Sequence, residues 1–294
     1  MDDEVKQKYI ESGEVIQKAR KKAREEAEAG KNLKHIAEAV EQLIREEGLE
    51  PAFPVNMSIN EEAAHYTPSE NEERVLKEDD VLKIDIGAHS DGYIADTALT
   101  VNPSGKYSEE IEAVEQVLEK ALDFIEPGKT VGEFGSYIEE QVPDGLTPVV
   151  NLTGHSLGQY TQHAGLSIPN VSNTNNYTFE KGDSVAIEPF LSKGSGKVAN
   201  AKEGNIYKLE SGKARGRATR KVMKKVKKFK GLPFTDRWID MSGKEKIAFK
   251  RLVKSEKIHS YPVLKDTGRV FQAEHTVLVG EGENGNIVTT DHKR

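Results

Sequence analysis

The sequence predicts an α+β protein made of two similar halves that pack around a shared sheet. The order helix, helix, strand, strand occurs twice before residue 190. The segments Asp80–Asp85 and Asp183–Glu188 also match, because each leads from a turn through apolar residues to a carboxylate. Strands resume near the C-terminus after a basic interruption. Repetition at this scale indicates an internal duplication; the alternative is chance similarity between short strands.

Two helices begin the first half. Residues 4–29 are rich in Glu, Lys and Ala, and Gly30 ends this pattern. Asn32 then caps a second helix whose apolar residues recur at helical spacing until Gly48. Asn before an amphipathic pattern and Gly after it are the usual signals for the two ends of a helix.

Strand-like stretches follow at 53–60 and 81–86. The second stretch continues into a hairpin, in which Lys83–Gly87 pairs with Tyr93–Val101 around a turn at residues 90–92. An Asp-Gly pair between alternating apolar residues is a strong hairpin signal.

The second half repeats this order. Helices are expected at 111–125 and 131–142, and Val150–Thr153 echoes the strand Val55–Ser58. Strands are expected again at 269–279 and 286–290.

A basic block separates these last strands from the rest. Residues 201–260 hold 19 Lys/Arg and 6 Asp/Glu, which gives this segment a charge of +13. Because the whole chain carries −7, the remaining residues together carry −20. We therefore expect a catalytic domain of residues 1–206 and 261–294, with 207–260 forming an inserted basic helical subdomain. The run 224–230 would either contact nucleic-acid phosphates or form a solvated face.

Composition narrows the functional classes. The chain has no cysteine, which excludes disulfides and thiolate metal sites. It has no apolar run near the roughly 20 residues of a membrane span. Its N-terminus is polar and acidic, unlike a secretory signal. We expect a cytoplasmic protein without a membrane partner.

Two carboxylates mark the hairpin. With the turn centred between residues 90 and 91, Asp85 and Asp96 would lie directly opposite each other. Facing carboxylates in an apolar setting repel, and a divalent ion between them removes that cost. The alternatives are that both side chains face solvent, or that Lys83 pairs with Asp85.

Three further residues complete a set of candidate metal ligands. Glu188 ends the repeated strand, Glu274 lies in a later strand, and His155 follows a glycine. One lysine does not neutralise four carboxylates. Four carboxylates and an imidazole suit two divalent ions that share ligands.

Two other histidines follow strand-like segments. His65 comes after the first strand of the first half, and His163 lies eight residues after His155. Each alone is typical of a hydrogen-bonded structural histidine. Together with the carboxylates they become candidates for acid–base or substrate-positioning roles.

Five blocks follow one another along the chain: FPVNMSINEEAAHYTP, VLKIDIGAHSDGYIADTALTV, VVNLTGHSLGQYTQHAG, VAIEPF and FQAEHTVLV. In this order they resemble the type II methionine aminopeptidases, whose archaeal form is similar in size. The resemblance implies the pita-bread fold, a pseudo-twofold α/β arrangement, with the basic block as the type II helical insertion. It implies metal ligands at Asp85, Asp96, His155, Glu188 and Glu274, catalytic residues at His65, His163 and Glu188, and substrate contacts at Phe53, His65, His163 and Tyr261.

The implied activity is hydrolytic removal of the initiator methionine from nascent proteins. Two divalent ions (Co, Mn, Fe, Zn or Ni), bridged by Asp96 and Glu274, would hold a water that Glu188 deprotonates. His65 or His163 would donate a hydrogen bond to the scissile carbonyl. The expected partners are nascent N-termini and, through the insertion, the ribosome; we expect a monomer. The alternatives are an Xaa-Pro dipeptidase of the same fold and a non-catalytic RNA-binding relative.

Overall fold

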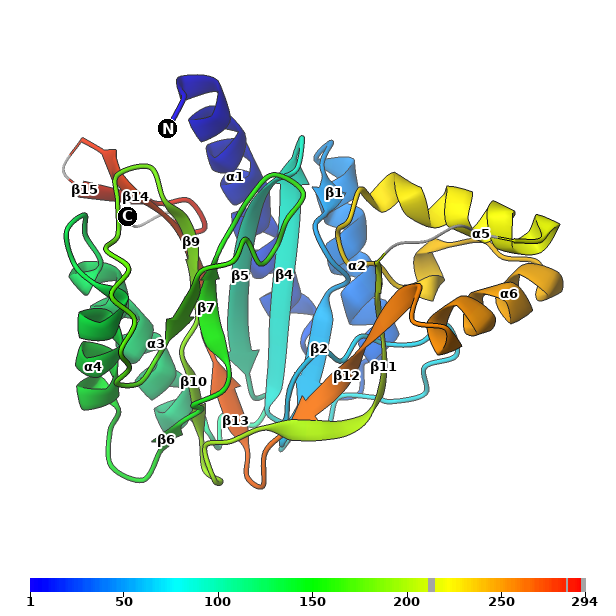
Figure 1. The fold of residues 1–294 in the computed structure, drawn as a ribbon. Helices are drawn as coiled ribbons and strands as arrows, with labels where there is room; N and C mark the ends of the chain where they lie inside the picture. The colour runs from blue at the N-terminus through cyan, green and yellow to red at the C-terminus, as the bar shows by residue number, and fades with distance from the viewer. Residues whose placement is uncertain (211–214, 284, 292–294) are drawn as a thin grey trace.

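The computed structural model describes residues 1–210, 215–283 and 285–291 (Figure 1). Its first half begins with helices α1 (Asp3–Glu26) and α2 (Leu33–Glu46). As expected, Asn32 caps α2, since its side chain accepts a hydrogen bond from the Lys34 N–H. Both helices bury an apolar face against the first sheet, where Ile16, Ile36 and Ile84 share one core. Each described helix is too short or too polar to cross a bilayer.

The first sheet holds the central hairpin. Strand β4 (Leu82–Ser90) pairs antiparallel with β5 (Tyr93–Val101) and, on its other side, with β2 (Asn56–Ile59) and the short β1 (Glu50–Pro51). Helix α1 runs behind β4 and β5 in Figure 1 and packs on both. Every residue of both strands is buried or half-buried, so neither face of the hairpin is open to solvent.

The second half repeats the arrangement. Helices α3 (Ser108–Phe124) and α4 (Val131–Gln141) cover a five-stranded sheet with the order β15-β14-β9-β7-β8. Its strands are β7 (Thr153–Ser156), β8 (Ser167–Pro169), β9 (Ser184–Ile187), β14 (His275–Gly282) and β15 (Gly285–Val288).

The two halves correspond element by element. A helix pair precedes β2 in the first half and β7 in the second, and each of these strands pairs antiparallel with the strand that leads to a carboxylate, β4 or β9. Three-stranded sheets complete the fold. One comprises β6 (Thr147–Pro148), β10 (Phe190–Ser192) and β13 (Val270–Gln272), and the other β3 (Glu62–Ala64), β11 (Ala199–Leu209) and β12 (Ile258–Lys265). The predicted pseudo-twofold α+β fold is confirmed.

The predicted register of the hairpin is wrong by two residues. Asp85 lies opposite Ala98, and Asp96 lies opposite Gly87. The turn is centred on Asp91 and Gly92, both of which adopt positive φ, at 48° and 89°. A two-residue turn of this kind matches the twist of the strands. Because a shift of two keeps every side chain on its face, both carboxylates still face the same side.

The basic insertion projects from the paired strands β11 and β12, at the right in Figure 1. It contains α5 (Arg217–Val226), α6 (Gly243–Lys254) and the 3₁₀ turns η1 (Lys227–Phe229) and η2 (Asp236–Trp238). Val222, Phe234 and Phe249 contribute to a hydrophobic cluster of its own. Residues 211–214 of the expected subdomain lie outside the described residues.

Candidate active site

A cavity of about 430 Å³ lies where the two halves and the base of the insertion meet. Every residue assigned to the site from the sequence lines it, including those from distant segments. These residues are Phe53, His65, Asp85, Asp96, His155, His163, Glu188, Tyr261 and Glu274.

The carboxylates on the floor come from adjacent strands. Asp85 is paired with Ala98, and the isolated bridge between Ala98 and Glu274 extends the same row to a third segment. Asp96 stands two residues before Ala98, on the same face, since side chains alternate along a strand. Thr97 points the other way, and its hydroxyl donates to the Glu274 carbonyl at 2.7 Å.

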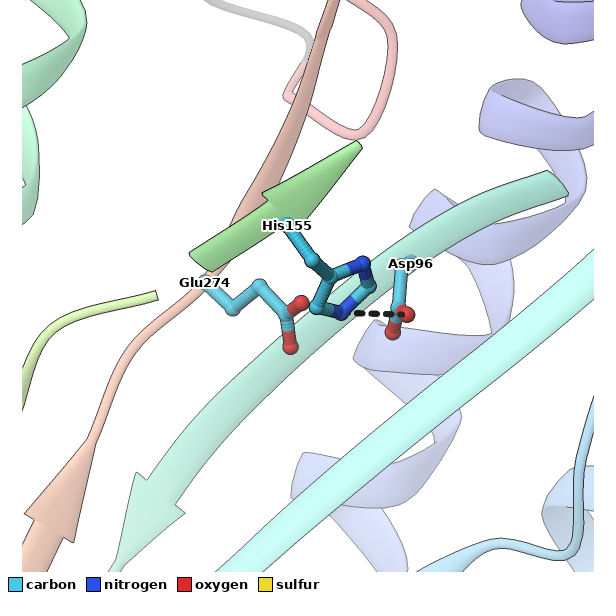
Figure 2. Close-up of side chains that lie close together, drawn as sticks. All are labelled: Asp96, His155 and Glu274. Atoms are coloured by element: carbon cyan, nitrogen blue, oxygen red, sulfur yellow. Dashed lines mark ion pairs between the residues drawn. The ribbon is translucent and has the colours of Figure 1, made fainter. Parts of the chain in front are cut away.

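His155 on β7 approaches these carboxylates from the second half. Its Nε2 lies 3.5 Å from Glu188 Oε1 and 4.0 Å from Asp96 Oδ2. Figure 2 shows the imidazole between Asp96 and Glu274, with its ring nitrogen directed at Asp96. Ligand atoms of these three residues lie within 4.8 Å of one another.

Burial is the main influence on the ionisation of this cluster, and repulsion between the carboxylates adds to it. Burial raises the pKa of Asp85 to about 7. Burial, followed by repulsion from neighbouring carboxylates, holds the pKa values of Asp96, Glu188 and Glu274 well above their usual range. Within the described residues, the cavity wall contains no Lys or Arg. A cation from outside the chain is therefore the natural counterpart.

The hairpin carboxylates Asp85 and Asp96 neither face solvent nor pair with Lys83, the two alternatives to metal binding. Asp96 is 1% exposed and the Oδ1 atom of the half-buried Asp85 is itself buried, so the pair does not face bulk solvent. Lys83 is equally buried, and its ammonium donates to the Asn60 carbonyl at 2.7 Å; among the described residues it forms no ion pair with Asp85.

The cluster fits divalent metal ions. Asp85 Oδ1 and Asp96 Oδ1 are buried and have no hydrogen-bond partner among the described residues. Buried polar atoms almost always have partners, so atoms without one need an explanation. Carboxylate oxygens with one imidazole suit a hard or borderline divalent cation.

Two glutamines that sequence reasoning missed contact the ligand set. Gln162 Nε2 lies 3.3 Å from Asp96 Oδ2, and Gln272 Nε2 lies 3.5 Å from Glu188 Oε2. The signal for each was its place beside a candidate residue, since Gln162 precedes His163 and Gln272 lies two residues before Glu274. Such contacts orient ligating carboxylates.

His65 is held in an unusual conformation at the cavity wall. Its φ is 66°, and its Nδ1 lies 3.2 Å from the Pro262 carbonyl. The Tyr261 ring packs against it edge-on at 5.3 Å. Burial lowers the pKa of His65 to about 4, which keeps the ring neutral at pH 7. His163, in the loop after β7, places its ring 4.3 Å from that of His155.

An apolar wall adjoins the carboxylates. It includes Phe53, Ile206 and Pro233. Gly87 leaves room for the Phe53 ring, because a Cβ at this position would lie 2.3 Å from Phe53 Cε1. The base of the insertion supplies Ile206, and the insertion itself supplies Pro233.

Known proteins match this chain along nearly all its length. The family model described as Metallopeptidase family M24 matches residues 7–281. The methionine aminopeptidase of Methanocaldococcus jannaschii is 44% identical, covering 99% of this chain and 100% of its own.

Solved structures share the fold. A thermophilic Arx1 has a TM-score of 0.86 at 18% identity, covering 98% of this chain and 91% of its own. A methionine aminopeptidase from Thermotoga maritima has a TM-score of 0.71 at 22% identity, covering 99% and 98%. The family match over residues 7–281 and the 44% identity to a methionine aminopeptidase place the chain in metallopeptidase family M24, among the methionine aminopeptidases.

Proposed function

We propose that this chain removes the N-terminal methionine from proteins by metal-dependent hydrolysis of the first peptide bond. This proposal depends on one observation above all: a buried group of carboxylates and one histidine adjoins an apolar wall in a single cavity. The 44% identity to a methionine aminopeptidase supports the same activity, and neither the dipeptidase nor the non-catalytic alternative is favoured.

Asp85, Asp96, His155, Glu188 and Glu274 would hold two divalent ions. When bound, such ions polarise a carbonyl oxygen and lower the pKa of a coordinated water toward neutrality. The identity of the ions is left open by the ligand types, because oxygen and imidazole donors accept several first-row metals.

His65 has a defined hydrogen-bonding role in this scheme. A carbonyl oxygen only accepts, so the Nδ1 facing Pro262 carries the proton. In the neutral ring Nε2 is then an acceptor. We therefore assign His65 to accept a hydrogen bond from a substrate N–H, rather than to donate one to the scissile carbonyl.

His163 and Glu188 take the remaining roles. His163 borders the same cavity beside His155 and is the candidate donor to the developing oxyanion. Glu188 is the carboxylate that we assign to accept the proton of the attacking water.

The methionine side chain would lie against Phe53, Ile206, Pro233 and Tyr261. These residues line the apolar side of the cavity next to the carboxylates. An unbranched thioether suits an apolar pocket of this kind, where a few polar groups at one end fix the orientation of the ligand.

The test is methionine release from Met-Ala-Ser and from Met-Pro by metal-loaded protein. An aminopeptidase of this specificity releases methionine from the tripeptide and leaves Met-Pro intact. Preference for Met-Pro would favour the Xaa-Pro dipeptidase, and inactivity on both peptides would support the non-catalytic alternative.

We infer that the ribosome is an additional partner, which the insertion would contact. Such a contact would place the enzyme in the cytoplasm beside nascent chains. Lys224, Lys227 and Lys228 are exposed, and none forms an ion pair within the part of the chain that the structure describes. Contacts with RNA phosphates weaken as salt rises. Co-sedimentation with ribosomes should therefore fall between low and high salt, and binding insensitive to salt would contradict the phosphate contact.

A further inference from the structure

A buried arginine joins the insertion to the catalytic body. Arg237 lies in η2, and its side chain is only 1% exposed. It forms a two-pronged ion pair with Glu41 of α2, with Nη1 3.0 Å from Oε2 and Nη2 2.9 Å from Oε1. The Trp238 indole N–H donates to the same carboxylate at 2.7 Å. A guanidinium paired in this way is fixed in both position and plane.

The same guanidinium also binds the segment that follows His65. Arg237 Nε donates to the Pro68 carbonyl at 2.9 Å, and Nη2 lies 3.2 Å from Thr67 Oγ1. The Thr67 hydroxyl in turn donates to the Val55 carbonyl at 2.9 Å. One insertion residue thus holds the side chain two positions beyond His65 and the backbone three positions beyond it.

This support matters because His65 adopts a conformation that its local sequence does not favour. A non-glycine residue at φ 66° costs about 1–3 kcal/mol and persists only where surrounding contacts impose it. On one side of the ring the Pro262 carbonyl accepts from Nδ1. The direction of the chain after His65 is set by Thr67 and Pro68, and Arg237 donates a hydrogen bond to each of these two residues.

We propose that Arg237 is a positioning residue for His65, so that the insertion is part of the catalytic apparatus. The inference rests on the proposed function. Among the described residues, the hydrogen bonds and ion pairs of Arg237 involve none of the five candidate metal ligands, so its loss should leave metal binding intact and lower kcat through His65. A misplacement of about 1 Å costs roughly 100-fold in rate, so we expect a loss of about 10- to 100-fold for Arg237→Met.

The test is a double-mutant cycle on metal-loaded protein with Met-Ala-Ser. Arg237→Met, His65→Ala and the double variant are compared in kcat and KM. If Arg237 acts through His65, Arg237→Met lowers kcat in the wild-type background and causes no further loss in the His65→Ala background. Equal losses in both backgrounds would overturn the proposal.

Two variants separate positioning from instability. Thr67→Val is nearly isosteric and removes only the hydroxyl link, so it should give a smaller kcat loss that also vanishes in the His65→Ala background. Lys225→Met breaks the 3.2 Å ion pair with Glu245 inside the insertion, away from residues 65–68, and should leave kcat unchanged. A Lys225→Met loss as large as that of Arg237→Met would attribute the effect to the insertion's stability.

An activity-independent readout distinguishes failure of this inference from failure of the proposed function. NMR titration of the His65 ring should show that Arg237→Met raises its pKa from about 4 toward the ordinary value, because the freed segment admits water. An unchanged titration would overturn the positioning role. Inactive wild-type protein together with a shifted titration would overturn only the proposed function.

Discussion

Asp85 and Glu274 lie in one row across three neighbouring segments, separated by the side chain of Ala98. Adjacent strands are about 4.8 Å apart, so the two Cα atoms stand roughly 10 Å apart. Within this row, the side chain between them is the methyl group of Ala98. The room for cations therefore depends on a residue that ligates nothing.

Replacing Ala98 with Leu should fill this space. We expect loss of bound divalent ion and a fall in unfolding free energy of about 1–3 kcal/mol, typical of overpacking. Elemental analysis after dialysis against Mn²⁺, together with chemical denaturation, measures both effects. Ala98→Ser is the matched control and should retain the metal. A Leu variant that binds a full complement of manganese would refute the geometry.

Metal removal should abolish activity and lower stability. Without cations the buried carboxylates repel one another, and binding to the folded state alone adds about 2.7 kcal/mol at 100 times the Kd. Activity on Met-Ala-Ser should return with Mn²⁺, Co²⁺ or Fe²⁺, and the melting temperature should rise. Asp85→Asn should blunt both responses. Full turnover by a chelated, metal-free sample would end the metal-dependent scheme.

His65→Ala should lower kcat by about 10²- to 10⁴-fold, the usual contribution of a positioned acid–base or hydrogen-bonding group. Metal content should not change, because His65 is not among the ligands. His35→Ala, on the exposed face of α2, serves as the control. Undiminished turnover of Met-Ala-Ser would remove His65 from the reaction.

Gly87→Ala should displace the Phe53 ring, because the new Cβ would overlap with it. We expect a higher KM for methionine peptides with a smaller change in kcat, since the apolar wall binds the side chain and not the reacting atoms. Steady-state kinetics on Met-Ala-Ser measures this. A KM equal to that of the wild type would place the methionine elsewhere in the cavity.

Asp266 should make the free energy of unfolding fall as the solution is acidified. Burial alone would raise the pKa of Asp266, but hydrogen bonds from the Ser192 and Ser195 hydroxyls and from the N–H groups of Thr267 and Gly196 outweigh it and lower the value to about 2. The carboxylate therefore stabilises the fold above its ordinary pKa of 3.8, and this contribution is lost as pH falls toward 2.

Asp266→Asn should accordingly lower the melting temperature at pH 7, and its difference from the wild type should shrink between pH 4 and pH 2. Thermal melts across that range test the sign. A difference that grows as the pH falls would contradict the assignment.

Local sequence patterns predicted the elements better than their pairing. Asn32, Gly48 and the repeated strands mark ends that depend on short-range chemistry, and these lie close to the predicted positions. The hairpin register depended on whether Asp91 takes a positive φ, which composition does not decide. The prediction that Asp85 and Asp96 face the same side was unaffected, because a two-residue shift in register leaves each side chain on the same face of its strand.

Long-range contacts were beyond the same reasoning. Arg237 looked like one charge among many in a basic block, and its partner Glu41 lies 196 residues earlier. Only its neighbour Trp238, the single tryptophan of the chain, marked the segment as different. A buried ion pair of this kind forms only when two distant segments pack together in the fold. The local sequence around either residue does not identify its partner.

Leu209 and Ile258 are paired across β11 and β12, so the chain leaves and re-enters the body at one point. In connectivity the insertion is therefore one excursion of the chain from the body, although Arg237 also ties it to Glu41. Doubling the length of such a loop costs only about 0.6 kcal/mol of closure entropy. A short turn could join β11 to β12 after excision, but Glu41 would then remain buried without its partner Arg237. A chimaera that exchanges this wall of the cavity between homologous enzymes must therefore keep the two residues matched.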